Sequence, residues 1–215
     1  MILSTGRNYV FVHIPKTGGT SLALALEARA MKDDIMLGDT PKARQRRHRV
    51  QGMTTKGRLW KHSTLSDIDG LVPGSVLDGL FAFTLVRNPW DRAVSYYHWL
   101  LSQRFDHPAV RLAQSLDFAG FVAHPQTLTS FGRNPAAHYM RRASGDEQCS
   151  AYIRIEHFDE DAAPLLDHLG FVLRLPTLNT SGRTADYRTY YTDENARVLG
   201  ESCASDIARF DYSFG

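Results

Sequence analysis

The sequence predicts an α/β fold with a central parallel sheet flanked by helices. Three short apolar segments have the composition of buried strands, and a segment of helical character follows each one: residues 9–14, 80–86 and 151–155. Strands that alternate with helices are typical of a parallel sheet. The 215 residues contain no repeat and no linker-like boundary. We therefore expect a single domain spanning residues 1–215.

The first predicted strand runs from Tyr9 to Ile14, and His13 is its only polar residue. Such a run suits a parallel strand that is covered on both faces. Pro15 ends the strand, because proline has no N–H to offer a neighbouring strand. Gly18 and Gly19 then allow a tight turn that brings backbone N–H groups close to a ligand.

A helix is expected over residues 22–30, with Thr20 or Ser21 as its N-cap. A strand, a glycine turn and a helix N-terminus together form an anion site, for which phosphate is the usual anion. The Walker A pattern requires a lysine directly before the Ser or Thr. Here Gly19 holds that place, and Lys16 stands four residues before Thr20. The alternative is an ordinary strand-to-helix turn with Thr20 as a plain cap.

The second predicted strand, residues 80–86, ends directly before Arg87. Pro89 fits the first turn of the helix that follows, and this helix carries Ser95. An arginine and a hydroxyl together suit a second phosphate. Each residue alone has a structural alternative, a salt bridge for Arg87 and a packing contact for Ser95. Two such groups at the carboxyl ends of parallel strands favour a nucleotide site.

The C-terminal part of the chain continues the alternation. The third strand, residues 151–155, precedes an amphipathic helix over 158–169 that Gly170 can end in a left-handed conformation. A polar loop is expected over 177–188, and helical spacing covers 192–210.

Two segments, about 32–60 and 103–148, are irregular and are expected on the acceptor side. The first contains a basic run over 42–49, which is either a solvated loop or a rim that attracts an anion. It ends in an extended piece near His62, followed by a short helix capped by Ser63 or Thr64. Within the second, residues 125–148 look loop-rich and include His138.

Composition excludes several classes of protein. A net charge of +2 does not support a nucleic-acid binder, and no apolar run reaches the roughly 20 residues of a membrane helix. Peripheral contact with a membrane is compatible with the sequence. No signal peptide is recognisable. Cys149 and Cys203 give neither a disulfide framework nor metal-ligand spacing, and the nine histidines have no zinc-site spacing. We expect a cytoplasmic protein without a metal.

Residues 11–21 resemble the 5′-phosphosulfate-binding loop of the sulfotransferases that use 3′-phosphoadenosine 5′-phosphosulfate (PAPS). Residues 83–97 resemble the 3′-phosphate-binding strand, turn and helix of that family. The sequence is most similar to the branch with carbohydrate and bacterial sulfotransferases, and residues 179–183, 190–191 and 206–212 also look like that branch. Only the first two motifs are specific.

The resemblance implies a fold related to P-loop kinases, a three-layer sandwich, with PAPS as donor, 3′-phosphoadenosine 5′-phosphate (PAP) as product and no required metal. Lys16 would neutralise the bridging oxygen of the donor, and Arg87 and Ser95 would bind the 3′-phosphate. The residues that the resemblance assigns to donor binding are Lys16, Thr17, Gly18, Gly19, Thr20, Ser21, Arg87, Ser95 and Arg183.

An acceptor hydroxyl also needs a base, and His62 resembles the histidine that has this role in the family. His13 and His138 are weaker candidates. The acceptor is expected to be a saccharide, glycolipid or other small molecule with a hydroxyl, an amine being less favoured. The alternatives are a P-loop kinase, disfavoured by the position of Lys16, and a non-catalytic relative that only binds the nucleotide.

Overall fold

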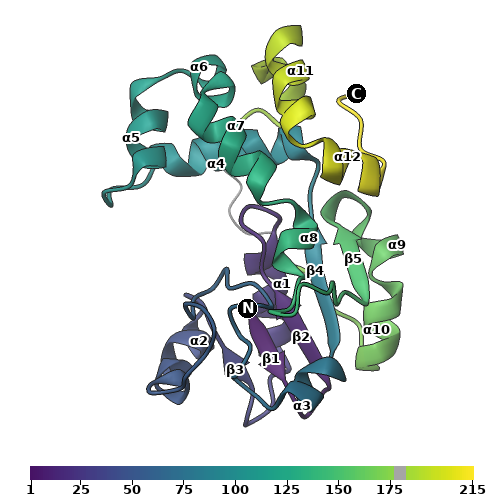
Figure 1. The fold of residues 1–215 in the computed structure, drawn as a ribbon. Helices are drawn as coiled ribbons and strands as arrows, with labels where there is room; N and C mark the ends of the chain where they lie inside the picture. Colours follow the sequence, from purple (N-terminus) through teal and green to yellow (C-terminus); the bar gives the residue numbers. More distant parts are fainter. Residues whose placement is uncertain (177–182) are drawn as a thin grey trace. The chain divides into compact units, whose positions relative to one another are not determined.

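The structure is a computed structural model in which residues 1–176 and 183–215 are described (Figure 1). The chain divides into two compact units. The first combines residues 1–86 with the described part of 136–178, and the second combines 87–135 with the described part of 179–215. The single domain expected from the sequence stays a prediction. Among the described residues, no helix is both long and apolar enough to cross a membrane.

A five-stranded sheet forms the centre of the first unit. Its strands are β1 (Ile2–Ser4), β2 (Tyr9–Val12), β3 (Ile35–Met36), β4 (Phe81–Val86) and β5 (Ala151–Arg154), in the order β3-β1-β2-β4-β5. β2, β4 and β5 are parallel, whereas β1 pairs antiparallel with both β2 and β3. The predicted α/β fold with parallel central strands is confirmed. The two antiparallel strands were not predicted, because runs of three and two residues carry no periodic signal.

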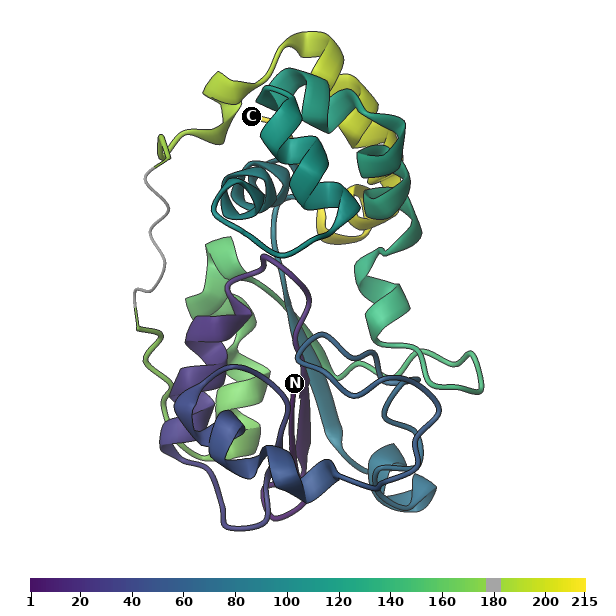
Figure 2. The same cartoon turned by 90° about the vertical axis from the view of Figure 1, so that its left-hand side faces the viewer.

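The core of the first unit is built on alternate side chains of the central strands. Tyr9 and Phe11 of β2 and Phe83 of β4 are fully buried on one face, where the Phe11 and Phe83 rings lie 5.4 Å apart. Leu22 of α1 (Gly19–Ala28) and Leu165 of α10 (Ala163–Leu169) belong to the same cluster. Figure 2 shows α1 and α10 side by side against this face. The helix after the phosphate loop is therefore fixed to the sheet by apolar burial.

The remaining helices of the first unit are short: α2 (Pro41–Arg46), η1 (Arg47–Val50), α3 (Gly74–Asp78), α8 (Ala136–Tyr139), η2 (Ile155–His157) and α9 (Phe158–Asp161). The predicted helix over 158–169 is two helices, α9 and α10, separated at Ala162. Gly170 has a φ of 71° and ends α10 as predicted. The helix predicted after Ser63 is wrong: Thr64 and Asp67 bond to each other and hold a turn.

The second unit is helical, with α4 (Pro89–Leu101), α5 (Pro108–Ser115), α6 (Phe118–Ala123), α7 (Pro125–Arg133), η3 (Tyr187–Tyr190), α11 (Asp193–Ser202) and α12 (Ala204–Phe210). Trp90 of α4 is buried, and its indole N–H donates to the Ala196 carbonyl of α11 at 2.8 Å. The loop-rich prediction for 125–148 is wrong where α7 and α8 lie. α7 buries Thr127 and Phe131, and Phe131 packs against Tyr96 of α4 in a contact that the polar sequence of α7 does not reveal.

Candidate functional site

The loop after β2 forms a cradle of backbone groups. Gly18 is the N-cap of α1 in a left-handed conformation, with a φ of 82°, and Lys16 also has a positive φ, 66°. A lysine in this region is strained, and such strain is concentrated at ligand sites. The Thr17 hydroxyl is buried and donates to the Ile14 carbonyl at 2.9 Å, which closes the turn. N–H groups at a helix start arranged in this way bind anions.

The two glycines are required by close packing. A Cβ atom on Gly18 would lie 2.0 Å from Cδ1 of Ile155, and one on Gly19 would lie 2.2 Å from Cδ2 of His13. The loop backbone therefore touches the segment after β5 on one side and the His13 ring on the other. The predicted cap is corrected: Gly18 is the N-cap without a side-chain hydrogen bond, and Thr20 and Ser21 lie within the first turn of α1. Their hydroxyls are consequently not used as caps.

His62 is held directly beside this loop. Its Nδ1 lies 2.7 Å from the carbonyl oxygen of His13, and because a carbonyl only accepts, Nδ1–H is the donor. The neutral ring then carries its lone pair on Nε2, which is the state a general base needs. The His62 ring meets the His13 ring at 4.7 Å and the half-exposed Trp60 ring at 5.0 Å, edge to face in both cases.

The other candidate bases have different environments. His13 is buried, and its ring stacks on Phe11 at 5.8 Å. Burial lowers the pKa of His13 well below its ordinary value, and the positive charges of the amino terminus, His62, Lys61 and Lys16 lower it further. His13 is therefore a neutral packing residue whose carbonyl orients His62. His138 is exposed on α8 and contacts the ring of Tyr139.

A second cluster of charges surrounds Asp91 of α4 in the second unit. Arg87 reaches one carboxylate oxygen, with Nη2 2.6 Å and Nε 2.8 Å from Oδ2. Arg183 places Nη1 2.6 Å from the other oxygen, Oδ1. Among the described residues neither Nη1 nor Oδ1 has a well-aligned hydrogen bond, so this contact is an ion pair. Two arginines thus converge on one carboxylate, and their side chains are only 15% and 13% exposed.

Ser95 and His98 lie on the same side of α4 as Asp91. Ser95 is four residues after Asp91 and His98 is three residues after Ser95, and residues at these spacings are neighbours on a helix surface. Ser95 is buried. Nε2 of His98 is buried and has no hydrogen-bond partner in the part of the chain that the structure describes. The His98 ring contacts Tyr97 and Tyr190, and burial, followed by the charge of Arg183, lowers its pKa.

The basic run predicted over 42–49 is mostly helical, in α2 and η1, and several of its residues are structural. Lys42 donates its ammonium to the Glu27 carbonyl at 2.7 Å, and Arg46 donates to the Met31 carbonyl at 2.8 Å. Arg49 also donates to the backbone of the 32–34 segment. Arg44 and Arg47, by contrast, are exposed. The predicted loop is therefore wrong, because the run is helical, and Lys42, Arg46 and Arg49 are held by backbone carbonyls.

The structure brings the predicted residues together in two separate groups. In the first unit His62 lies beside the loop of 16–21. In the second unit Arg87 and Arg183 share the carboxylate of Asp91, and Ser95 lies one helical turn after Asp91 on α4. Residues 179–182 of the C-terminal motif lie outside the described residues. Asp91 and His98 were missed by sequence reasoning. Their spacing of four and three residues from Ser95 was the available signal.

Comparison with known proteins gives one family match. The family model described as the sulfotransferase family matches residues 1–203. Nothing in the search of curated proteins matches this chain. Among solved structures, the chain is similar to mouse sulfotransferase SULT7A1 complexed with PAP, with 14% sequence identity, a TM-score of 0.48, and coverage of 95% of this chain and 85% of that one. Because this TM-score is below 0.5, the family assignment depends on the match of the family model to residues 1–203.

The low pKa of His13 predicts a loss of stability in acid. The unfolded chain binds a proton near the ordinary pKa of 6.5, whereas the folded His13 does not, so the free energy of unfolding falls as pH drops below 6.5. One such histidine contributes a slope of at most about 1.4 kcal/mol per pH unit. Urea unfolding between pH 7.5 and 5.5 should show a flatter profile for His13→Gln. The exposed His48→Gln is the control, and an unchanged slope in His13→Gln would contradict the assignment.

Proposed function

This chain belongs to the sulfotransferase family, and we propose that it transfers the sulfuryl group of PAPS to an acceptor hydroxyl and releases PAP. The observation that carries the proposal is the loop of residues 16–21. Its backbone cradle admits no side chain at Gly18 or Gly19, and its lysine approaches from the strand end rather than from the Walker position. A cradle of this kind fits a phosphate group.

The residues present fit a donor with two separate phosphate groups. We propose that the N–H groups of residues 17–20 and the hydroxyl of Ser21, whose own N–H donates to the Gly18 carbonyl at 3.0 Å, bind the 5′-phosphate. Lys16 is proposed to neutralise the oxygen that bridges phosphate and sulfate. Arg87, Ser95 and Arg183 are proposed to bind the 3′-phosphate. The support is chemical: two largely buried arginines that share a single carboxylate retain a net positive charge, and guanidinium groups bind phosphate in a bidentate way.

In the proposed reaction the donor supplies a sulfuryl group whose departure leaves charge on a phosphate oxygen. Lys16 and the helix N-terminus stabilise that charge as fixed donors, without rearrangement. His62 accepts the proton of the attacking hydroxyl on Nε2, while the Nδ1–H bond to the His13 carbonyl holds the ring in place and stabilises the imidazolium that forms.

Two rival functions are disfavoured. A P-loop kinase would have its lysine at the position of Gly19, and an acidic residue at the end of an apolar strand to hold Mg²⁺. β4 ends at Val86 and Arg87 follows it. A relative that only binds the nucleotide would have no need of a base oriented through one nitrogen, as His62 is.

Ligand-dependent stability tests the donor. A ligand at 100 times its dissociation constant stabilises the folded state by about 2.7 kcal/mol. Thermal unfolding should therefore shift upward with PAP in wild-type protein and much less in Arg87→Ala, with the exposed Arg104→Ala as control. Stabilisation by ATP with Mg²⁺ and none by PAP would overturn the proposal in favour of a kinase.

Transfer from labelled PAPS tests the catalytic roles. We expect Lys16→Ala and His62→Ala to lose at least 100-fold in turnover, since a positioned base alone contributes about 10²–10⁴-fold. Both should still bind PAP, and Lys32→Ala and His48→Gln should behave like wild type, because both residues are exposed. Near-normal turnover of His62→Ala would remove His62 as the base and make His138→Ala the next variant.

PAP binding should also take up a proton at His98. Its pKa is lowered first by burial and then by the charge of Arg183, and a phosphate dianion beside Ser95 and Arg183 would offset that charge. Calorimetry at pH 7 in two buffers of different ionisation enthalpy should give proton uptake for wild type and a smaller uptake for His98→Gln. Equal uptake in the two proteins would contradict a phosphate position near His98.

A further inference from the structure

Four basic side chains of the first unit gather around Phe171, which follows α10. The Cζ atom of Arg7 lies 5.0 Å from the centre of the Phe171 ring, and that of Arg29 lies 5.4 Å from it. Nε of Arg7 also donates to the Arg29 carbonyl at 3.1 Å. Lys32 and Arg174 are exposed, the first three residues after Arg29 and the second three residues after Phe171. These four side chains are called the basic group below.

Exposed apolar side chains lie beside the basic group. In the segment after α10, Leu173 is buried in the core, whereas Val172 and Arg174 on either side of it are exposed. Val172 is 73% exposed, although the burial of Leu173 fixes the segment that carries it. Met31 is 41% exposed, and its sulfur packs against Gly6 in the turn between β1 and β2. Apolar and cationic side chains therefore share one surface of this unit.

No carboxylate neutralises the basic group. None of its four members has an ion pair in the part of the chain that the structure describes. The contact with the Phe171 ring orients the two guanidinium groups and leaves their charge in place. The exposed carboxylates nearest in sequence are Asp33 and Asp167. The surface thus keeps a net charge of +2 (4 − 2).

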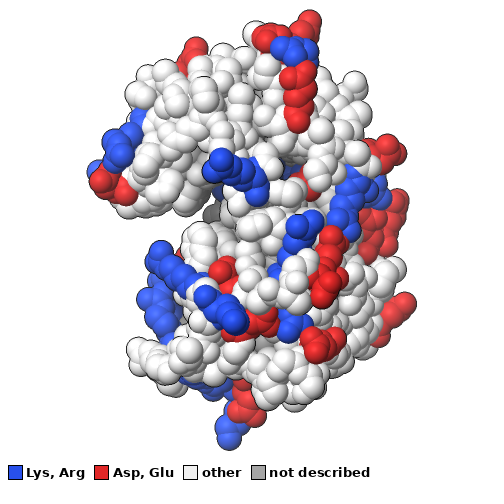
Figure 3. Space-filling view, in the orientation of Figure 1, with Lys and Arg blue, Asp and Glu red and all other residues white. Residues whose placement is uncertain are grey.

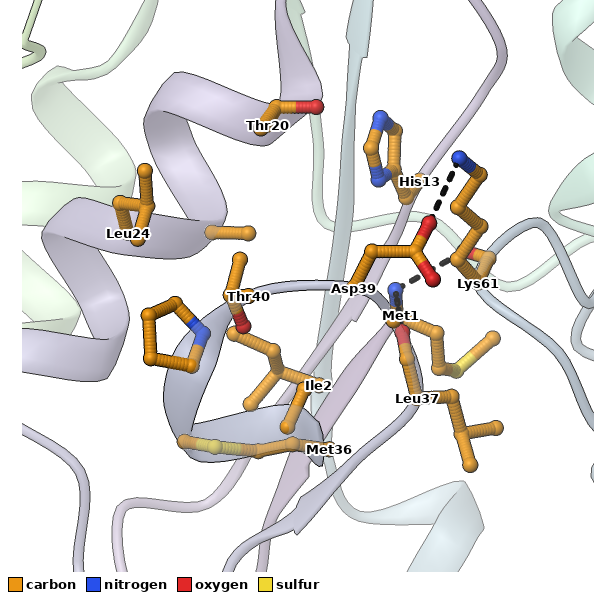
Figure 4. A pocket seen from close by; sticks show the side chains of 14 residues that line it. Met1, Ile2, His13, Thr20, Leu24, Met36, Leu37, Asp39, Thr40 and Lys61 are labelled. Atoms are coloured by element: carbon orange, nitrogen blue, oxygen red, sulfur yellow. Dashed lines mark hydrogen bonds and ion pairs between the residues drawn. The ribbon is translucent and has the colours of Figure 1, made fainter. Parts of the chain in front are cut away.

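The charges beside the phosphate loop differ in this respect. A pocket of about 210 Å³ with a mainly apolar wall adjoins that loop, and Thr20 and the His13 ring line it, so it belongs to the site described above (Figure 4). Its Lys61 is paired with Asp39 at 2.9 Å. On the face of the first unit that Figure 3 shows, acidic and basic side chains also lie close to one another. The basic group has no such partner among the described residues and therefore suits an anionic partner from outside the chain.

The basic group lies at the opposite end of α1 and β2 from the phosphate loop. Arg29 is the C-cap of α1, whose N-terminus begins in that loop, and the ten residues of α1 span about 15 Å. Arg7 precedes β2, and the loop follows β2. A partner that binds the basic group consequently leaves the loop open.

We propose that this end of the first unit docks on a membrane surface that contains anionic phospholipids. The four basic side chains bind lipid phosphates, and Val172 and Met31 enter the boundary between head groups and acyl chains. Unneutralised cations around exposed apolar side chains match the two layers of such a surface. A dissolved anion would satisfy the cations and leave Val172 in water, so the bilayer is the better match. This inference does not depend on the proposed function.

Co-sedimentation with vesicles tests the surface. The protein would be spun with vesicles of phosphatidylcholine alone and of phosphatidylcholine with phosphatidylglycerol. We expect at least ten-fold tighter binding to the anionic vesicles, since each net positive charge near such a surface contributes about five-fold. Raising NaCl from about 0.1 M to about 1 M should remove the difference, because the screening length falls from about 10 Å to about 3 Å. Equal binding to the two kinds of vesicle, or none to either, would overturn the inference.

A charge variant tests the location. Arg29→Gln with Arg174→Gln removes two exposed cations and should reduce the affinity for anionic vesicles at least ten-fold. The matched control, Arg104→Gln with Arg133→Gln, removes the same charge from exposed positions of the second unit and should bind like wild type. An equal loss in the two variants would mean that net charge alone attracts the vesicles and would contradict the proposed site.

A tryptophan reporter tests insertion. In Val172→Trp the added indole should be quenched by brominated lipid in anionic vesicles, beyond the quenching of the three natural tryptophans in wild type. Val76→Trp is the matched control, because Val76 is 37% exposed on α3 of the same unit. Equal quenching at the two positions would contradict the proposed orientation.

Other occupants of this surface give different results. Sedimentation velocity without vesicles should show the same species for wild type and Val172→Ser. A dimer that Val172→Ser dissociates would assign the surface to a second copy of the chain and overturn the inference. PAP should shift the thermal unfolding of Arg29→Gln with Arg174→Gln as much as that of wild type, because the loop lies at the other end of α1. A smaller shift would assign these arginines to donor binding instead.

Discussion

The close approach of the backbone at Gly18 and Gly19 is the constraint on which the first unit depends. One glycine has Ile155, directly after β5, where its side chain would be, and the other has the ring of His13. The loop is thereby fixed to two strand ends at once, and α1 starts in one defined direction. Because the His13 carbonyl also holds Nδ1 of His62, the same packing contact orients the cradle of N–H groups, the strained Lys16 and the proposed base.

The second unit holds two arginines close together, with their guanidinium groups on one carboxylate. Two guanidinium groups repel each other, and Asp91 offsets this repulsion by sharing its carboxylate between Arg87 and Arg183. The start of α4 is fixed around them: Asn88 caps the helix through Trp90 N–H, and its amide donates to the Ser213 carbonyl at 2.9 Å. An anion that binds here meets arginines that are already oriented, so little side-chain entropy is lost on binding.

The basic run shows how one sequence feature divides between structure and surface. Lys42 and Arg46 donate to carbonyls at the end of α1 and in the segment after it, and they anchor α2 to that part of the chain. Arg44 and Arg47 project from the same short helices and carry charge toward Asp39. The residues that fix α2 therefore also position the exposed arginines, although composition alone would suggest one basic surface.

The sequence by itself determined the three parallel strands, the glycine loop, Lys16 as a displaced lysine, and the placement of Arg87 after a strand and of Ser95 on the helix that follows. These features depend on residues near one another in the chain, where period and spacing report structure directly. Tertiary structure alone decided that the His13 carbonyl, 49 residues away, orients His62, that Asp91 joins Arg87 to Arg183, and that an apolar pocket adjoins the loop. It also decided that β1 and β3 extend the sheet and that Gly18, not Thr20 or Ser21, caps α1. The physical reason is that these outcomes depend on contacts between distant segments, and packing energies between such segments leave no periodic trace in either one.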